Sequence, residues 1–381
     1  MLSFAVLLAS LFAFGRTAEI AGNGAKVLPN GKYELQSEGI RAQFIPYAAS
    51  ITNLFIKDVH GVERDIVLGF DNATIKNSTF TIDGNTYHTD PNDNKGLDTL
   101  HGGSDGWDYR NWTVVAHTTD SITFSLVDPD GKEGFPGEVI AYVTYALTPH
   151  SWHLRMSALS TTKKTPIMLS SHDYWNLDGY QNPDTPLILN HTLHMPYAGQ
   201  RIAIDGISIP TGEILSNPKY SLNDFWSSPK QLGANLTNPD LLGNCGTNCT
   251  GYDNCYLTNR QKPYDWRVKP VATLASPFSG IQVDVFTEQE ALQVYTCNNM
   301  NGTFALKETQ GFFNDSSRPR VSNKYGCVVI EVEDWIDGIN HPEWGREEKQ
   351  IFGPGDGGYE LRARYDFSLN QELVNNYRKD L

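Results

Sequence analysis

Apolar and polar residues alternate along most of the chain with the two-residue period of a β-strand. Ile122, Phe124 and Leu126 alternate with polar neighbours, and similar runs cover residues 281–286 and 292–296. Alternation of this kind is typical of strands that bury one face and expose the other. The pattern predicts half-buried antiparallel strands, and no helical period persists over three turns.

Turn motifs separate these runs, and they contain glycine, proline, asparagine and aspartate in the combinations that tight turns favour. The clearest are Asp83-Gly84, Asp128-Pro129-Asp130-Gly131, Gly134-Phe135-Pro136-Gly137 and Gly353-Pro354-Gly355. No charged or low-complexity linker divides the chain. We therefore predict an all-β fold, a large antiparallel β-sandwich that forms a single domain over residues 20–381.

The overall charge narrows the range of partners. The chain has 381 residues, with 44 Asp and Glu against 30 Lys and Arg, which gives a formal net charge of −14. A polyanion needs a cationic surface, so we expect no nucleic-acid partner. We expect no metal site either, because the three cysteines between positions 245 and 255 have no histidine at zinc-finger spacing.

The N-terminus carries an apolar run over residues 4–14 that only Ser10 interrupts. This run is too short to span a bilayer, and it has the length of the apolar core of a signal peptide. We predict a signal peptide over residues 1–18, with the cleavage site between residues 15 and 21. Nothing later is long and apolar enough for a membrane span, so the sequence predicts a secreted protein without a membrane partner.

Eight Asn-x-Ser/Thr sequons support export and predict N-glycans. They begin at Asn72, Asn77, Asn111, Asn190, Asn235, Asn248, Asn301 and Asn314.

The five cysteines fit the same oxidising compartment. Cys245, Cys249 and Cys255 form a cluster, whereas Cys297 and Cys327 stand apart near later strands. We predict one or two disulfides and a free thiol.

Three segments combine reactive side chains with aromatic residues: 100–108, 171–177 and 330–335. An imidazole and a carboxylate on opposite sides of a sugar ring can serve as acid and base. Aromatic side chains such as Trp175 offer flat surfaces for the C–H faces of a pyranose, unless they belong to the core. Glu331 and Glu333 share one face of a strand, where they either face solvent or are buried for a functional reason.

These segments, in this order, resemble the aldose 1-epimerases, also called galactose mutarotases. The resemblance covers nearly the whole mature chain and rests on collinear motifs. Among them are Leu100-His101-Gly102-Gly103, Ser171 to Gly179, Gly251-Tyr252-Asp253, Gln293-Val294-Tyr295-Thr296, Ile330-Glu331 and Asp337-Gly338-Ile339-Asn340-His341-Pro342. The fold implied by the resemblance is the large twisted supersandwich of that family, with an open cleft on one sheet.

The resemblance also implies an activity and residue roles. The activity is interconversion of the α and β anomers of a free hexose of the glucose or galactose class, without a cofactor. Glu331 would be the base and His172 the acid, while His101 and Asp253 would hold sugar hydroxyls. We add Glu333 and Trp175 to the predicted substrate-binding residues.

The chain departs from the family pattern at two places. Ala73-Thr74 stands where the family usually has an Asn-Arg pair, and Glu333 stands where it commonly has Gln. Loss of a charge-assisted donor predicts weaker binding of simple hexoses, by roughly 1.5 to 3 kcal/mol.

Two alternative functions follow from these departures. One is a glycoside hydrolase or lyase on the same fold, with Glu331 and either Glu333 or Asp337 as its carboxylate pair. The other is a non-catalytic secreted carbohydrate-binding protein.

Overall fold

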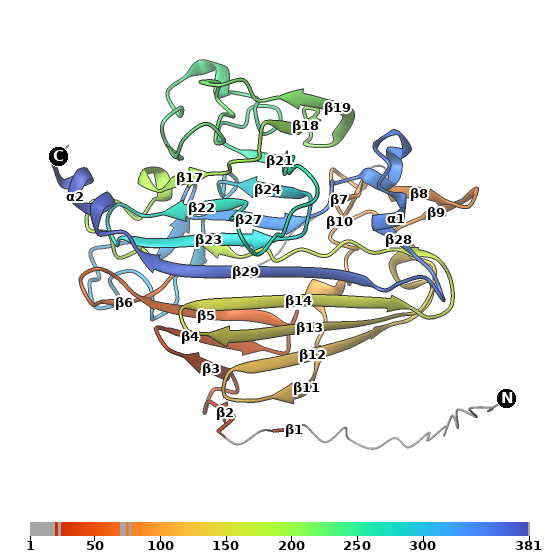
Figure 1. The fold of residues 1–381 in the computed structure, drawn as a ribbon, viewed down its shortest axis with the longest axis horizontal. Helices are drawn as coiled ribbons and strands as arrows, with labels where there is room; N and C mark the ends of the chain where they lie inside the picture. Colours follow the sequence, from red (N-terminus) through yellow and green to blue (C-terminus); the bar gives the residue numbers. More distant parts are fainter. Residues whose placement is uncertain (1–19, 22–23, 69–73, 76–77, 380–381) are drawn as a thin grey trace.

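The computed structural model describes residues 20–21, 24–68, 74–75 and 78–379. The predicted signal peptide and the sequons at Asn72 and Asn77 lie outside these residues. In the described part of the chain, two large layers of β-strands face each other, as the sequence predicts (Figure 1).

One layer is a ten-stranded sheet. Its strands, in spatial order, are β1 (Ile20–Ala21), β11 (Thr113–His117), β12 (Ser121–Asp128), β13 (Val139–Thr148), β14 (Ser151–Ser160), β29 (Tyr359–Leu369), β23 (Ile281–Thr287), β22 (Ala272–Ala275), β17 (Thr192–His194) and β20 (Lys230–Gln231). Neighbouring strands are antiparallel except for β1 and β11. Figure 1 shows β11 to β14 and β29 lying side by side as long ribbons.

The second layer combines two sheets. A five-stranded sheet contains β2 (Lys26–Val27), β3 (Tyr33–Ser37), β4 (Ile40–Ile45), β5 (Ser50–Lys57) and β6 (Glu63–Asp65). A six-stranded sheet contains β16 (Tyr174–Trp175), β27 (Val328–Glu333), β24 (Ala291–Tyr295), β21 (Asp253–Leu257), β18 (Gln200–Ile204) and β19 (Pro210–Ser216). A bridge between Val67 and Trp175 connects the two sheets.

Smaller elements cover the ends of the sandwich. Four two-stranded sheets pair β7 (Thr74–Ile75) with β10 (Thr99–Leu100), β8 (Thr79–Ile82) with β9 (Asn85–His88), β15 (Thr165–Pro166) with β28 (Ile351–Phe352), and β25 (Asn301–Ala305) with β26 (Val321–Asn323). The α-helices are α1 (Glu347–Gln350) and α2 (Gln371–Lys379). The 3-10 turns are η2 (Trp107–Tyr109), η3 (Lys132–Gly134), η4 (Ile188–Asn190), η5 (Pro239–Leu241), η6 (Gly338–Asn340) and η7 (Pro342–Trp344).

The period-two pattern places the core between the layers. In β12, Ile122, Phe124 and Leu126 are buried while their neighbours are partly exposed. Together with apolar residues of the second layer, such as Leu54 and Ile330, they belong to one hydrophobic core. Burial of this apolar surface is the main stabilising contribution to such a sandwich.

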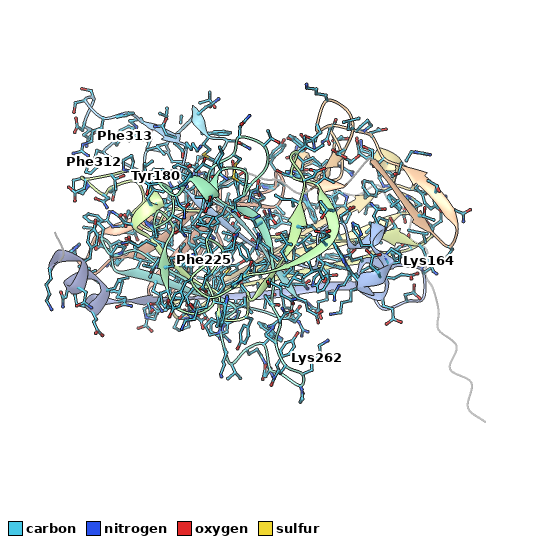
Figure 2. All side chains as sticks on the ribbon, turned by 90° about the horizontal axis from the view of Figure 1, so that it is seen from above. Lys164, Tyr180, Phe225, Lys262, Phe312 and Phe313 are labelled. Carbon is cyan, nitrogen blue, oxygen red and sulfur yellow. A yellow bond between two sulfur atoms is a disulfide. The ribbon has the colours of Figure 1, made fainter. Side chains whose placement is uncertain are left out.

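The two ends of the sandwich differ. Figure 2 shows Tyr180, Phe312 and Phe313 at one end, and Lys164 at the opposite end. Lys164 directly precedes β15, and its ammonium group is paired with Asp83 in the tight turn of the β8–β9 hairpin. This second end of the sandwich carries the candidate site.

The cysteines form two disulfides, Cys245–Cys249 and Cys297–Cys327. Cys255 is free and buried. The prediction of a free thiol in this set is therefore confirmed. None of the helices in the described part of the chain is both long and apolar enough to cross a membrane.

Candidate functional site

A cavity of about 310 Å³ opens at the end of the sandwich near β15. His101, His172 and Glu331 line it together, although they come from three segments far apart in sequence. His101 follows β10, His172 directly precedes the β16 region, and Glu331 lies in β27. The cavity thus contains three of the residues that the sequence predicts for the site.

Glu331 and His172 form an acid–base contact in this cavity. Nε2 of His172 lies 3.4 Å from Oε1 of Glu331, and both side chains are buried. Every residue of β27 is buried, so the possibility that Glu331 and Glu333 face solvent is wrong. A buried carboxylate is costly unless it has partners, and His172 supplies one for Glu331.

The environment of His172 favours its neutral form. Burial, and then the nearby His101 imidazole, lower the pKa of His172 to about 3. Its ring also contacts the Tyr174 ring at a centroid distance of 4.8 Å. The imidazole of the free protein is therefore uncharged near neutral pH, whereas the resemblance implies a proton donor.

His101 lies in a strained turn. Its φ is 58°, and Gly102 and Gly103 follow with φ of 81° and 101°, values that residues other than glycine rarely adopt. A Cβ at Gly103 would lie 2.1 Å from the Glu133 carboxylate, which would have to move, and the φ of 101° would strain any side chain at this position. Strained residues of this kind cluster at functional sites.

The partners of this turn hold His101 in place. The Glu133 carboxylate accepts hydrogen bonds from the backbone N–H groups of Ser104 and Asp105, at 3.1 and 3.2 Å. Nδ1 of His101 lies 3.5 Å from Oδ2 of Asp108, which leaves Nε2 buried with no protein partner among the described residues. Burial lowers the pKa of His101, and Asp108 opposes that shift. A neutral imidazole with an unpaired nitrogen suits hydrogen bonding to a sugar hydroxyl.

Asp253 and Gln293 lie on the neighbouring strands of the same sheet. Gln293 in β24 is directly opposite Glu331 in register, and its Nε2 donates to Oδ1 of Asp253 in β21 at 2.6 Å. Burial raises the pKa of Asp253 to about 6. Oε1 of Gln293 is buried without a hydrogen-bond partner in the described part of the chain.

Gln293 is a candidate site residue that sequence reasoning missed. The signal was present, because the Gln293 motif belongs to the collinear set and Gln293 stands between the core residues Leu292 and Val294, so it points to the other face of the strand. Only the strand register shows that it connects Asp253 to Glu331.

Three predicted substrate-binding residues, Asp253, Trp175 and Glu333, lie outside the cavity lining. Trp175 is 1% exposed and packs against Trp152, Tyr365 and Phe367 in the core between the layers. Its prediction as a sugar platform is wrong, because Trp175 pairs with the inward-facing Val328.

Glu333 shares the site face of β27 with Glu331, yet it does not line the cavity. Burial, followed by repulsion from Asp334 and Asp253, raises the pKa of Glu333 to about 8. Glu333 is therefore a neutral carboxylic acid at neutral pH, and the structure gives no contact that would bring it to a ligand in the cavity.

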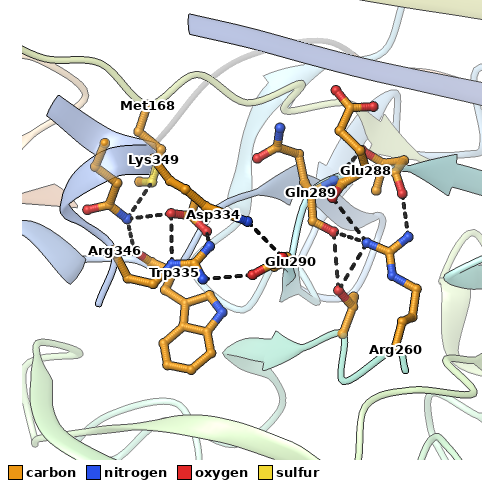
Figure 3. Close-up of polar contacts among 12 residues, drawn as sticks. Met168, Arg260, Glu288, Gln289, Glu290, Asp334, Trp335, Arg346 and Lys349 are labelled. Carbon is orange, nitrogen blue, oxygen red and sulfur yellow. Dashed lines mark hydrogen bonds and ion pairs between the residues drawn. The ribbon is translucent and has the colours of Figure 1, made fainter. Parts of the chain in front are cut away.

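An ion-pair network fixes the end of β27 next to the site (Figure 3). The Arg346 guanidinium pairs with Asp334 through both Oδ atoms and with Glu290 Oε2 at 2.7 Å. Lys349 adds a second contact to Glu290 at 2.7 Å. The side chain of Gln350 donates to Asp334 and to the Trp335 carbonyl, and Gln350 also lines the cavity. The network connects β27 to α1 and so holds one wall of the site.

The described residues that line the cavity contain no unpaired Lys or Arg that could replace the arginine of the family pattern. The backbone of Thr74 pairs with Leu100, next to His101, and Ala73 lies outside the described residues. Lys132 is the one Lys or Arg among the described cavity-lining residues, and it is paired with Asp105 and Glu133.

The described residues contain no cluster of three or more histidine, cysteine or acidic side chains arranged to hold a metal ion. The contact between Glu331 and His172 supports proton exchange with a bound polar molecule.

Comparison with known proteins extends this description. The family model described as "Aldose 1-epimerase" matches residues 31–356. A probable aldose 1-epimerase from Arthroderma benhamiae is 38% identical, with 91% of this chain and 88% of the relative covered. A galactose mutarotase from Homo sapiens is 30% identical, with 90% and 96% covered.

The fold agrees with these relatives. A solved structure of a GalM/aldose epimerase homologue from C. elegans superposes with a TM-score of 0.74 at 24% identity, and the match covers 90% of this chain and 99% of the other. The likeness confirms the predicted supersandwich. The match of the family model over most of the sequence, together with relatives at 30% identity or more, shows that this chain belongs to the aldose 1-epimerase family.

Proposed function

We propose that Glu331 and His172 carry out the anomer interconversion of this family. Glu331 takes the proton of the anomeric hydroxyl while His172 gives a proton to the ring oxygen, which opens the ring. Rotation about the C1–C2 bond and closure on the other face give the second anomer. The roles of the two groups are exchanged on closure, so no covalent intermediate is needed.

The contact between His172 and Glu331 carries this proposal. With Nε2 and Oε1 3.4 Å apart, the two groups can share one proton, and the pair then titrates as a unit. Burial and the nearby His101 imidazole lower the pKa of His172, so the protonated imidazole that the reaction needs is a minor form of the free protein at neutral pH. Productive turnover requires one proton on the pair, placed on His172.

The substrate is a cyclic sugar of the glucose or galactose class. His101 lines the cavity and supplies a hydrogen-bonding group for a ring hydroxyl, and the hydrogen-bonded Asp253–Gln293 pair lies on the strands next to Glu331. The hydrolase alternative retains one of its two carboxylate pairs, because Asp337 lines the cavity together with Glu331 whereas Glu333 does not.

We also propose that the protein is secreted and N-glycosylated. The supporting observations are the apolar run at residues 4–14 and the sequons. Asn111, Asn248, Asn301 and Asn314 are exposed, as an acceptor must be. Two disulfides are also consistent with an oxidising compartment.

Polarimetry of freshly dissolved α-glucose and α-galactose tests the activity directly. The purified protein should accelerate the approach to anomeric equilibrium above the spontaneous rate, in proportion to its concentration. Binding of either sugar without acceleration would instead identify a non-catalytic sugar-binding protein. Release of reducing sugar from a disaccharide would identify a hydrolase.

A further inference from the structure

The cavity changes character along its length. Every residue from Ile167 to Asp173 lines it, and this segment is apolar as far as Leu169 and polar from Ser170 onward. The polar end contains His172 and Glu331. The order of residues along one extended segment therefore defines an axis that runs from an apolar end to the proposed proton-transfer pair.

The apolar end penetrates between the two layers. Val143 in β13 and Met156 in β14 are opposite each other in register, and both line the cavity. Ile51 in β5 and Trp112 also line this end of the cavity. All four residues are at most 6% exposed, because they also belong to the core. This wall presents hydrocarbon to a ligand and has little to offer a hydroxyl group.

The cavity is large enough for a small organic ligand that extends from the polar end into the apolar end. Its 310 Å³ falls in the range of roughly 300–1,000 Å³ that is typical of pockets for drug-sized ligands. A pyranose has hydroxyl groups around its ring, and burying them against Val143 and Met156 without partners is unfavourable. An alkyl or aryl group in the same place gains from being removed from water.

We propose that the preferred substrate is a cyclic hemiacetal sugar with an apolar alkyl, acyl or aryl substituent, which binds in the apolar end while the hemiacetal lies at the His172–Glu331 pair. This inference rests on the proposed function. The substituent is on a carbon other than C1, because the reaction exchanges the proton of the C1 hydroxyl. Burial of the substituent also adds binding free energy. This gain offsets the loss of the usual family arginine, in whose place the chain has Thr74.

Sugar ethers of graded length test the proposal in the unmodified protein. The probes are 6-O-octyl- and 3-O-octyl-D-glucose below their micelle concentrations, with the matching methyl ethers and glucose as references, and the anomer exchange is followed by NMR. At least one octyl ether should have a kcat/KM about tenfold or more above that of its methyl ether, since each buried methylene favours binding several-fold. Equal values for octyl and methyl ethers at both positions would overturn the inference.

A matched pair of variants locates the effect. Val143→Phe fills the apolar end and should bring the ratio of octyl to methyl kcat/KM close to one. Val127→Phe is the control, because Val127 is on the outer face of the same sheet and 53% exposed. A ratio that both variants lower equally would place the octyl group elsewhere.

The two proposals fail in distinguishable ways. Turnover of glucose and the methyl ethers without an octyl preference retains the proposed function and overturns the apolar subsite. No acceleration for any of the sugars overturns both. Because the first comparison uses the wild-type protein, it stands even if Val143→Phe does not fold.

Discussion

Nε2 of His172 and Oε1 of Glu331 lie 3.4 Å apart in a buried cavity, with His101 close enough to lower the pKa of His172. If this pair carries the reaction, Glu331→Gln should lower kcat by about 10²- to 10⁴-fold with little change in KM, because the amide keeps the shape but cannot take a proton. His172→Asn should have a similar effect. The measurement is polarimetry against the spontaneous background, and wild-type kcat in Glu331→Gln would refute the assignment.

The depressed pKa of His172 predicts an acidic optimum for the reaction. Because its charged form becomes populated only as the pH falls below the ordinary value of 6.5 toward about 3, kcat should increase when the pH is lowered from 8 to 5. The increase ends where Glu331 becomes protonated. Initial rates of mutarotation across this range test the prediction, with the spontaneous rate subtracted at each pH. A rate that is constant from pH 5 to 8 would mean that His172 acts as a neutral donor.

Glu333 should make the protein less stable at alkaline pH. Its pKa is raised from 4.5 to about 8 in the folded protein, so its stabilising contribution is complete below pH 4.5 and is lost as the pH rises through 8. One pKa unit corresponds to about 1.4 kcal/mol, so we expect a loss of roughly 1–3 kcal/mol in the free energy of unfolding between pH 6 and 9. Glu333→Gln should reduce this dependence in urea titrations. An unchanged slope in the variant would assign the loss to another group.

The network beside the site predicts unequal effects of two neighbouring basic residues. Arg346→Ala removes the partner of the buried Asp334 and should destabilise the fold by about 3–5 kcal/mol. Lys349→Ala removes a side chain that is 45% exposed, and it should cost less than about 1 kcal/mol. Denaturant unfolding of both variants checks the contrast, and equal losses would show that Asp334 does not depend on Arg346.

The sequons should differ in occupancy. Nδ2 of Asn190 donates to the Tyr377 hydroxyl at 2.9 Å, and Nδ2 of Asn235 donates to the Leu222 carbonyl at 3.3 Å. Both amides are partly buried, so we expect no glycan on either of them after secretion. Glycans should be present on the exposed Asn111, Asn248, Asn301 and Asn314. Peptide mapping by mass spectrometry decides the matter, and glycan-bearing Asn190 or Asn235 would show that these contacts form late or not at all.

The sequence predicted the strands well, because the two-residue period directly reports which side chains face the core. It could not predict how the strands are connected. The runs in β23 and β24 are separated by Glu288, Gln289 and Glu290, which is a length typical of a hairpin, yet β23 belongs to the ten-stranded sheet and β24 to the opposite layer. A strand buries the same alternate side chains whether the next strand pairs with it in one sheet or crosses to the opposite layer, so the sequence pattern does not distinguish the two connections.

The candidate site was predicted in part. One cavity brings together His101, His172 and Glu331, as the motifs imply. Trp175 instead faces the core, and the sequence could not show this because the two-residue strand β16 is too short for an alternation pattern. The apolar end of the cavity was not predictable, because Val143 and Met156 have the same pattern as any core residue. Only the positions of side chains in three dimensions distinguish a lining residue from a packed one.

Strand β29, the last strand of the chain, lies between β14 and β23 in the middle of the larger sheet. Strands synthesised before residue 160 form one part of that sheet, and strands between residues 192 and 287 form the other. During translation, the edges of β14 and β23 therefore lack their β29 partner until residues 359–369 have left the ribosome. Unpaired strand edges readily associate with other chains. A chain truncated before Tyr359 would therefore leave the edges of β14 and β23 without the strand that pairs with both.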